Sequence, residues 1–575
     1  MQLKELKNKV RRNGFDNSRR VLFTAKGGEI LPIHCMEVLP GDVHTIDLKS
    51  FGRSRPLNKA SFARMREYYD VYFVPYRLLY NKFNDSINQV DNQTHASSIY
   101  EPITFSKEFP HIVAQDVMNY LNALGDSENE VGESRKKASQ KLLSYLLYRG
   151  FDDASLVNTA SNPFGNQSLN MFPLLGYQKI YQDYFRNALW ENSSPWTYNV
   201  DYVSGTNKTL RIASQVLLQH NNLFDLQYCN YDKDYFHGIL PSPQYGDETI
   251  ANLVVNNLRG NVTLAINDNG GVASPPLTVN TTSKFIQYQG SSAMSGTQDL
   301  KVYANLANIF NDPNTEAGVS VLAMRYANAL QKWKEITLSS EDLSFKSLLE
   351  KHWNVTTSEL LSNRCTYLGG ISSNLDVNPI TNTNLSEGNA DMKATGSVSS
   401  NGVIRFENKN NEYGLLYVIY HCKPIIEWRQ RDVMPKMNFK TSAEDYAIPE
   451  LDSIGMQGVP AIEFVSQTEL QDAFGTSVAN WYKTLGYAPR YVDYKTQFDV
   501  VLGEFQTTIE SMTLPYSLTS ESLVNGSLSY IDFKVNPSVL DNLFAVDSDR
   551  ADHFENSVYI NIKSVRNLDR DGLPY

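Results

Sequence analysis

Basic side chains crowd the start of the sequence, where they could bind phosphate groups. Residues 1–26 contain eight lysines and arginines against two acids, a net charge of +6, so the remaining residues carry −11 − 6 = −17. A basic arm on an acidic body is typical of a terminus that binds nucleic acid. The alternative is a solvated terminus, or a strap between subunits. The candidate nucleic-acid-binding residues are Lys4, Lys7, Lys9, Arg11, Arg12, Arg19 and Arg20.

The rest of the sequence offers little that could catalyse a reaction. It contains no phosphate-binding loop of the form G-x-x-x-x-G-K-[ST], no H-E-x-x-H and no G-x-S-x-G. His34 beside Cys35 is the one close pair of soft metal ligands, and one pair cannot complete a zinc site. Residues 569–572 have part of a calcium-loop spacing without the following acid, which favours a turn. We therefore predict that the protein is not an enzyme, with no catalytic residues, no metal and no cofactor.

Bulk composition indicates a soluble protein with a sizeable core. Hydrophobic residues make up 41% of the chain and charged residues 20%. No apolar stretch is long enough to span a bilayer and no secretory signal is visible, so we expect synthesis in a cytoplasm. The four cysteines lie too far apart for a disulfide framework and are expected to be buried free thiols. They are Cys35, Cys229, Cys365 and Cys422.

Tyrosine is unusually frequent, with 34 Tyr beside 26 Phe and 6 Trp. A tyrosine side chain offers a large rigid surface with a polar tip, which suits interfaces that are partly apolar and partly wet. Aromatic residues also favour β-strands, so composition leaves an interface-rich protein and a β-rich protein equally open.

Alternation with a period of two residues predicts several of the elements. In residues 558–563 Val and Ile alternate with polar residues and Tyr, and residues 66–74 read as a strand rich in aromatic side chains. Residues 413–421 are apolar enough for a strand that is buried on both faces. Residues 21–48 look like strands separated by Gly27-Gly28 and Pro40-Gly41.

Helical stripes are fewer, and all of them are expected to face the core. One stripe, with Gly150 placed to end the helix, consists of Leu142, Leu143, Leu146 and Leu147. Leu322, Tyr326, Ala329, Leu330 and Trp333 form a second, and residues 345–353 a third.

Two stretches differ in amino-acid composition from the rest of the chain. Residues 251–300 are rich in Asn, Gly, Ser and Thr but keep short apolar alternations, which predicts a small β-rich excursion; residues 371–411 are similar. Strands distant in sequence with long loops between them favour a mainly β fold, a sandwich or an eight-stranded antiparallel jelly roll, over a parallel α/β sheet.

A series of motifs, in order along the chain, resembles the major capsid protein of the Microviridae, most closely its gokushovirus-like and Bacteroides-associated branches. The most specific stretch is RPLNKASFARMREYYDVYFVPYRLLYNKF at residues 55–83. The other matching blocks are FTAKGGEILPIHCMEVLPGD (23–42), YQKIYQDYFRN (177–187), YDKDYFHGILPSPQYG (231–246), YLGG (367–370), GYAPRYVDYK (486–495) and VYINIKSVRNLDRDGLPY (558–575). Residues 84–170, 251–300 and 371–411 match poorly.

The resemblance implies a jelly-roll subunit, sixty copies of which form a T=1 icosahedral shell around circular single-stranded DNA. It divides the chain into a basic N-terminal arm (1–26) and a single capsid domain (27–575). Within that domain about 195–315, with a core at 251–300, is the expected surface protrusion, at a threefold axis, and 371–411 a second variable loop. The surface loops are expected to be used in host attachment, and the protein to reside in the virion after assembly in the bacterial cytoplasm.

The resemblance also implies several partners. They are the single-stranded DNA genome, a small basic DNA-associated virion protein, an internal scaffolding protein during assembly, a pilot or minor virion protein and a host cell-surface receptor. An acidic subunit with a net charge of −11 cannot neutralise packaged DNA, which agrees with the expected basic partner. A β-rich protein that binds or cleaves carbohydrate is the competing hypothesis, and the ordered motifs argue against it.

Overall fold

The computed structural model describes most of the chain, which forms two compact units. The described residues are 12–57, 61–80, 83–87, 109–151, 163–193, 197–198, 222–243, 253–256, 263–267, 278–279, 286–287, 301–305, 316–319, 321–338, 345–358, 363–381, 392–409, 411–452, 455–520, 522–523, 527–545 and 551–570. The larger unit comprises residues 1–244 and 341–575, and the smaller one residues 245–340.

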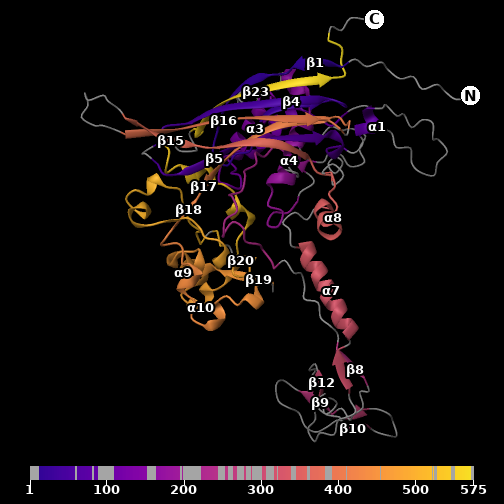
Figure 1. The fold of residues 1–575 in the computed structure, drawn as a ribbon, viewed down its shortest axis with the longest axis vertical. Helices are drawn as coiled ribbons and strands as arrows, with labels where there is room; N and C mark the ends of the chain where they lie inside the picture. Colours follow the sequence, from indigo (N-terminus) through magenta and orange to yellow (C-terminus); the bar gives the residue numbers. More distant parts are fainter. Residues whose placement is uncertain are drawn as a thin grey trace, which may run out of the picture. The chain divides into compact units, whose positions relative to one another are not determined.

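A six-stranded antiparallel sheet forms one layer of the larger unit (Figure 1). Its strands are β1 (Asn13–Asp16), β2 (Arg19–Ala25), β4 (Val43–Ser54), β15 (Asp376–Thr381), β16 (Met392–Glu407) and β23 (Phe554–Arg566). Their order is β1-β23-β4-β16-β15, and β2 also pairs with β23. Val558, Ile560 and Ile562 of β23 are completely buried while Tyr559 is exposed, which confirms the alternation predicted there.

A four-stranded antiparallel sheet forms the second layer, in the order β14-β5-β17-β3. Its strands are β3 (Leu31–Val38), β5 (Arg64–Pro75), β14 (Thr366–Asn374) and β17 (Gly414–Ile425). Residues 414–422 of β17 are all buried, because this strand lies between β5 and β3 and is covered on both faces. The sequence predicted both β5 and a doubly buried β17, and both are confirmed.

The two sheets face each other across one hydrophobic core. Phe73 of β5 lies against Phe406 of β16 with ring centroids 5.1 Å apart, and Phe23 of β2 contacts Tyr420 of β17 at 4.9 Å. Gly52 of β4 is needed at this junction, because a Cβ there would lie 3.0 Å or less from atoms of Asn556, Val398 and Glu67.

Short helices and small sheets surround this sandwich. The helices are α1 (Phe83–Ile87), α2 (Ala114–Leu124), α3 (Arg135–Tyr145), α4 (Phe172–Ile180) with its π-helical continuation η5 (Tyr181–Phe185), α8 (Phe345–Trp353), α9 (Gln467–Phe474), α10 (Val478–Trp481) and α11 (Val492–Lys495). The small sheets pair β6 (His111–Val113) with β7 (Ser168–Asn170), β19 (Met456–Pro460) with β20 (Thr484–Pro489), and β18 (Glu427–Arg429) with β21 (Val500–Val501) and β22 (Pro515–Tyr516). Among the described helices, none is long and apolar enough to cross a membrane.

The described residues of the smaller unit form three antiparallel strand pairs and one helix. The pairs are β8 (Leu253–Asn256) with β13 (Glu316–Val319), β9 (Thr263–Asn267) with β12 (Lys301–Asn305), and β10 (Thr278–Val279) with β11 (Ile286–Gln287). The helix is α7 (Val321–Leu338). The short strands predicted within 251–300 are thus confirmed, and the segment expected as a protrusion, 195–315, overlaps this unit.

Two segments expected as a variable loop and as a basic arm also contribute strands to the six-stranded sheet. Within 371–411, β15 and β16 pair with each other and β16 also pairs with β4. The alternation there is carried by Gly396, Val398, Ile404 and Phe406, and Gly, Ser and Asn between them conceal it in the sequence. Of the predicted arm 1–26, residues 13–16 and 19–25 pair with β23.

All three helical predictions were wrong in detail, and the third stripe, on α8, is not a core stripe because Phe345 is 62% and Trp353 71% exposed. Helix α3 ends at Tyr145 and not at Gly150, because Leu147 already takes a positive φ of 63° and is 72% exposed. The stripe at residues 322–333 does form a helix, but it is not a core stripe: Leu322 is 76% and Tyr326 69% exposed.

Candidate functional site

Three of the seven candidate nucleic-acid-binding residues lie in the described part of the chain. Lys4, Lys7, Lys9 and Arg11 fall outside it. Arg12 is exposed just before β1, and its guanidinium donates a hydrogen bond to the carbonyl of Gly41. Arg19 and Arg20 lie next to each other on β2.

Neighbouring positions on β2 give Arg19 and Arg20 different surroundings. The half-buried Arg19 donates from Nη2 to the carbonyl of Ile33 at 3.1 Å, and burial lowers its pKa. Arg20 is exposed and donates from Nε to Ser557 Oγ at 3.0 Å. Arg19 therefore ties β2 to β3, whereas Arg20 is more accessible to a partner.

Both arginines line a groove of about 890 Å³ over β2 and β4. Apolar side chains are exposed beside them: Leu22 is 68%, Phe51 56% and Leu147 72% exposed. Together with Arg53, which pairs with Glu555 at 2.7 Å, they form a surface that is both cationic and apolar. Such surfaces mark contacts with another macromolecule.

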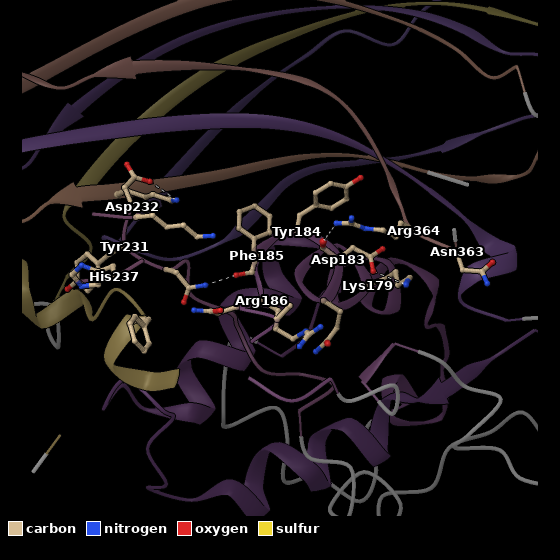
Figure 2. Close-up of a pocket in the computed structure, with 17 residues that line it drawn as sticks. Lys179, Asp183, Tyr184, Phe185, Arg186, Tyr231, Asp232, His237, Asn363 and Arg364 are labelled. Atoms are coloured by element: carbon tan, nitrogen blue, oxygen red, sulfur yellow. Dashed lines mark hydrogen bonds and ion pairs between the residues drawn. The ribbon is translucent and has the colours of Figure 1, made fainter. Parts of the chain in front are cut away.

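A second and more strongly cationic cavity lies under the four-stranded sheet. It has a volume of about 880 Å³ and is lined by residues from α4, η5, the segment 230–237, β17 and the residues just before β14. Figure 2 shows Lys179, Asp183 and Arg364 at one end, Tyr231, Asp232 and His237 at the other, and Phe185 and Arg186 between them. We call this the basic pocket.

Cations outnumber anions in the basic pocket by five to two. The cations are Lys179, Arg186, Lys233, Arg364 and Lys423, and the anions are Asp183 and Asp232. The acids pair with Lys179 and Lys423, each at 2.9 Å. The pKa of Lys233 is lowered by burial and by the neighbouring charge of Lys423, so an anion bound between these two lysines would relieve their repulsion.

Buried polar atoms of this pocket have no hydrogen-bond partner among the described residues. They are Gln182 Oε1, Arg186 Nε, Asn230 Oδ1 and His237 Nε2. Buried polar atoms are rarely left unpaired, so a ligand with both donors and acceptors would suit the cavity. Tyr184, Phe185, Tyr231 and Phe533 add aromatic faces. Cationic, amide and aromatic groups together fit a nucleotide, with its phosphate, base edges and flat ring.

The His34–Cys35 pair offers no comparable chemistry. Burial lowers the pKa of His34 to about 3 and raises that of Cys35 to about 12, so the adjacent imidazole and thiol are both uncharged at neutral pH. Over the described residues, no group of three or more His, Cys, Asp or Glu side chains could hold a metal ion. The cysteines are free thiols, buried at Cys229, Cys365 and Cys422 and half-buried at Cys35.

Comparison with known proteins decides the family. A model of the family described as "Capsid protein (F protein)" matches residues 5–122 and 144–574. This chain belongs to that capsid protein family. Capsid protein VP1 of Bdellovibrio phage phiMH2K is 21% identical over 562 residues, which cover 94% of this chain and 91% of the phage protein. Capsid protein VP1 of Chlamydia phage 1 is 22% identical over 578 residues, covering 90% and 88%.

These relatives are gokushovirus-like, which confirms the resemblance to the Microviridae. The chain is thus a capsid protein of small bacteriophages: a structural protein of the virion that assembles in many copies into a shell.

Sequence reasoning missed the basic pocket, although it singled out two of the segments that line it. The blocks YQKIYQDYFRN (177–187) and YDKDYFHGILPSPQYG (231–246) supply most of its residues. Basic and aromatic residues alternate closely in both blocks. That alternation was the available signal, but nothing in the sequence indicated that the two blocks meet.

Proposed function

We propose that this capsid protein is a jelly-roll subunit and that sixty copies form a T=1 icosahedral shell around circular single-stranded DNA. The observation that carries the proposal is the order of the strands. We take β1 and β2 as one strand, because both pair with β23, and set aside β15, an edge strand that pairs with β16. The two sheets then hold eight further strands, which in chain order are β1/β2, β3, β4, β5, β14, β16, β17 and β23.

In this order the first strand pairs with the eighth, the second with the seventh, the third with the sixth and the fourth with the fifth. All four pairings are antiparallel. This is the pattern of one long hairpin rolled into two facing sheets, and it supports a jelly roll of two Greek keys, an architecture used in viral capsids.

The finer features of assembly are proposed from the family. Residues about 195–315 would build a protrusion at a threefold axis, and the surface loops would contact a host cell-surface receptor. Assembly in the bacterial cytoplasm would use an internal scaffolding protein, and the virion would also hold a pilot or minor protein. A small basic DNA-associated protein would neutralise the genome, because the subunit itself carries −11.

Contact with DNA is proposed at two places on the subunit. The first is the basic N-terminal segment, of which Arg12 and Arg20 are exposed. The second is the basic pocket, whose five cations and aromatic side chains suit a phosphate and an unpaired base. Both places require a position on the inner face of the shell.

Electron microscopy of the expressed protein tests the shell. We expect uniform closed particles, and a reconstruction would place the basic pocket and the N-terminal segment relative to the packaged DNA. Monomers that are retained on a glycan column would contradict the proposal and favour a carbohydrate-binding protein instead.

A further inference from the structure

Helix α7 exposes more apolar surface than a single helix should leave in water. It has 18 residues, none of them buried, and Leu322, Tyr326 and Trp333 are 76%, 69% and 53% exposed. Removing such side chains from water is favourable. A soluble chain keeps so large an apolar face when another surface covers it.

The spacing of these apolar residues indicates which kind of surface would cover them. Leu322, Tyr326, Ala329, Trp333 and Ile336 follow one another at intervals of four, three, four and three residues. This is the heptad pattern in which positions a and d form the seam of a coiled coil. A second helix of similar length and with the same period would therefore pack against this seam, and another copy of α7 is such a helix.

The charges beside the seam decide the direction of the partner. With Tyr326 at position a, Arg325 and Lys332 occupy the two g positions, and the e positions hold Ala323, Leu330 and Thr337. Antiparallel helices bring g opposite g, which would set cations against cations. Parallel helices bring g opposite e, where no charge opposes them.

Parallel packing of identical helices also agrees with a closed shell. Identical chains whose helices run in the same direction are related by a rotation axis along the helices, and such axes are present in every icosahedral shell. The rotation axis rests on the proposed shell. The heptad pattern and the charges beside it are features of the sequence and do not depend on the shell.

We propose that the α7 helices of neighbouring subunits pack in parallel around a rotation axis of the shell, through the seam Leu322–Tyr326–Ala329–Trp333–Ile336. The seam is an interface between copies of this chain, and it joins subunits through the inserted unit 245–340.

Cysteine cross-linking in assembled particles tests the proposal. The background variant is Cys35→Ser, which removes the one native cysteine that is not buried. In that background Leu322→Cys places a thiol at the first seam position, and Asn328→Cys places an exposed thiol on the opposite face of α7 as a matched control. In parallel helices the thiols introduced at position 322 of two subunits meet, since a disulfide needs Cα atoms roughly 4.4–6.8 Å apart.

We expect oxidation to link most Leu322→Cys chains into dimers on a non-reducing gel, and to leave Asn328→Cys at the background level. In an antiparallel pair residue 322 would face residue 336, roughly 21 Å along the helix from its own copy, and no disulfide would form. Particles in which Leu322→Cys stays monomeric would therefore overturn the proposal while leaving the shell itself intact.

A second measurement does not depend on any substitution. A reconstruction of unmodified particles should resolve α7 beside the α7 of another subunit, both running in the same direction. A map in which the seam faces solvent or another element would also overturn the proposal. Absence of particles altogether would contradict the proposed shell and not the seam.

Discussion

Glu67 is a single carboxyl group whose protonation is tied to the folding of the sandwich. It is 1% exposed on β5, and its carboxylate accepts hydrogen bonds from Tyr69 Oη and Tyr420 Oη, both at 3.3 Å. Burial raises its pKa from 4.5 to about 7. The folded state therefore holds this proton more tightly than the unfolded chain does. Its contribution to stability is full below pH 4.5 and is lost as the pH rises through about 7.

We expect Glu67→Gln to reduce the loss of stability between about pH 5 and pH 8, because the amide keeps the side chain neutral throughout. The check is thermal melting of wild type and variant at several pH values, with the exposed Glu504→Gln as the control. Equal pH dependence of the wild type and Glu67→Gln would show that Glu67 does not titrate in this range.

The Lys233→Gln variant tests whether the basic pocket binds single-stranded DNA. Lys233 lines the basic pocket beside Lys423 and is a candidate phosphate contact, and Lys233→Gln removes its charge. We expect weaker binding of a labelled single-stranded oligonucleotide and a salt dependence that is shallower by about 0.7 in the slope of log K against log salt. Fluorescence anisotropy of the subunit at several salt concentrations measures both. Lys409→Gln, an exposed lysine outside the pocket, is the control; an identical loss there would assign the effect to net charge.

At the scale of elements, Arg19 and Arg20 are adjacent on β2 but have different roles. Arg19→Ala removes the hydrogen bond to the Ile33 carbonyl, which should cost about 1–2 kcal/mol of subunit stability. Arg20→Ala on the exposed side should leave stability unchanged.

We expect the combined Arg11→Ala, Arg12→Ala and Arg20→Ala variant to form shells that retain less DNA than wild type. The ratio of ultraviolet absorbance by nucleic acid to that by protein in purified particles measures this, and urea unfolding of Arg19→Ala measures the structural role separately. Wild-type DNA content in the triple variant would mean that the segment is a solvated terminus or a strap.

Sequence patterns predicted those strands whose burial alternates or is continuous. β5, β17 and β23 were predictable because Val, Ile and aromatic residues mark their buried positions directly. β16 was not, since Gly396 and Ser side chains occupy many of its positions and their burial depends on Leu375 and Ser54 of other elements. The predicted core stripe of α7 has the right period, but periodicity alone does not tell a core from an interface. The basic pocket was equally hidden, because its residues come from segments far apart in the chain, from Lys179 to Phe533.

At the scale of the whole molecule, the inserted unit can be removed at a natural boundary. Leu253 of β8 is paired with Val319 of β13, so the two ends of the segment 253–319 are neighbours across an antiparallel ladder. A two-glycine linker could therefore replace the segment without stretching the chain. Deleting only 251–300 would instead leave β12 and β13 without their partners.

We expect the 253–319 deletion to assemble into shells and to lose attachment to the host, since the sandwich sheets and the basic pocket lie outside the deleted segment. Electron microscopy measures assembly, and adsorption of purified particles to host cells measures attachment. The control is a shorter deletion of the β10–β11 hairpin, residues 278–287, which keeps the other two strand pairs. If neither deletion affects adsorption, the receptor must bind elsewhere on the shell. If only the long deletion prevents assembly, strands β8 to β13 are needed to hold α7 in the parallel seam. The insert would then join subunits as well as attach to the host.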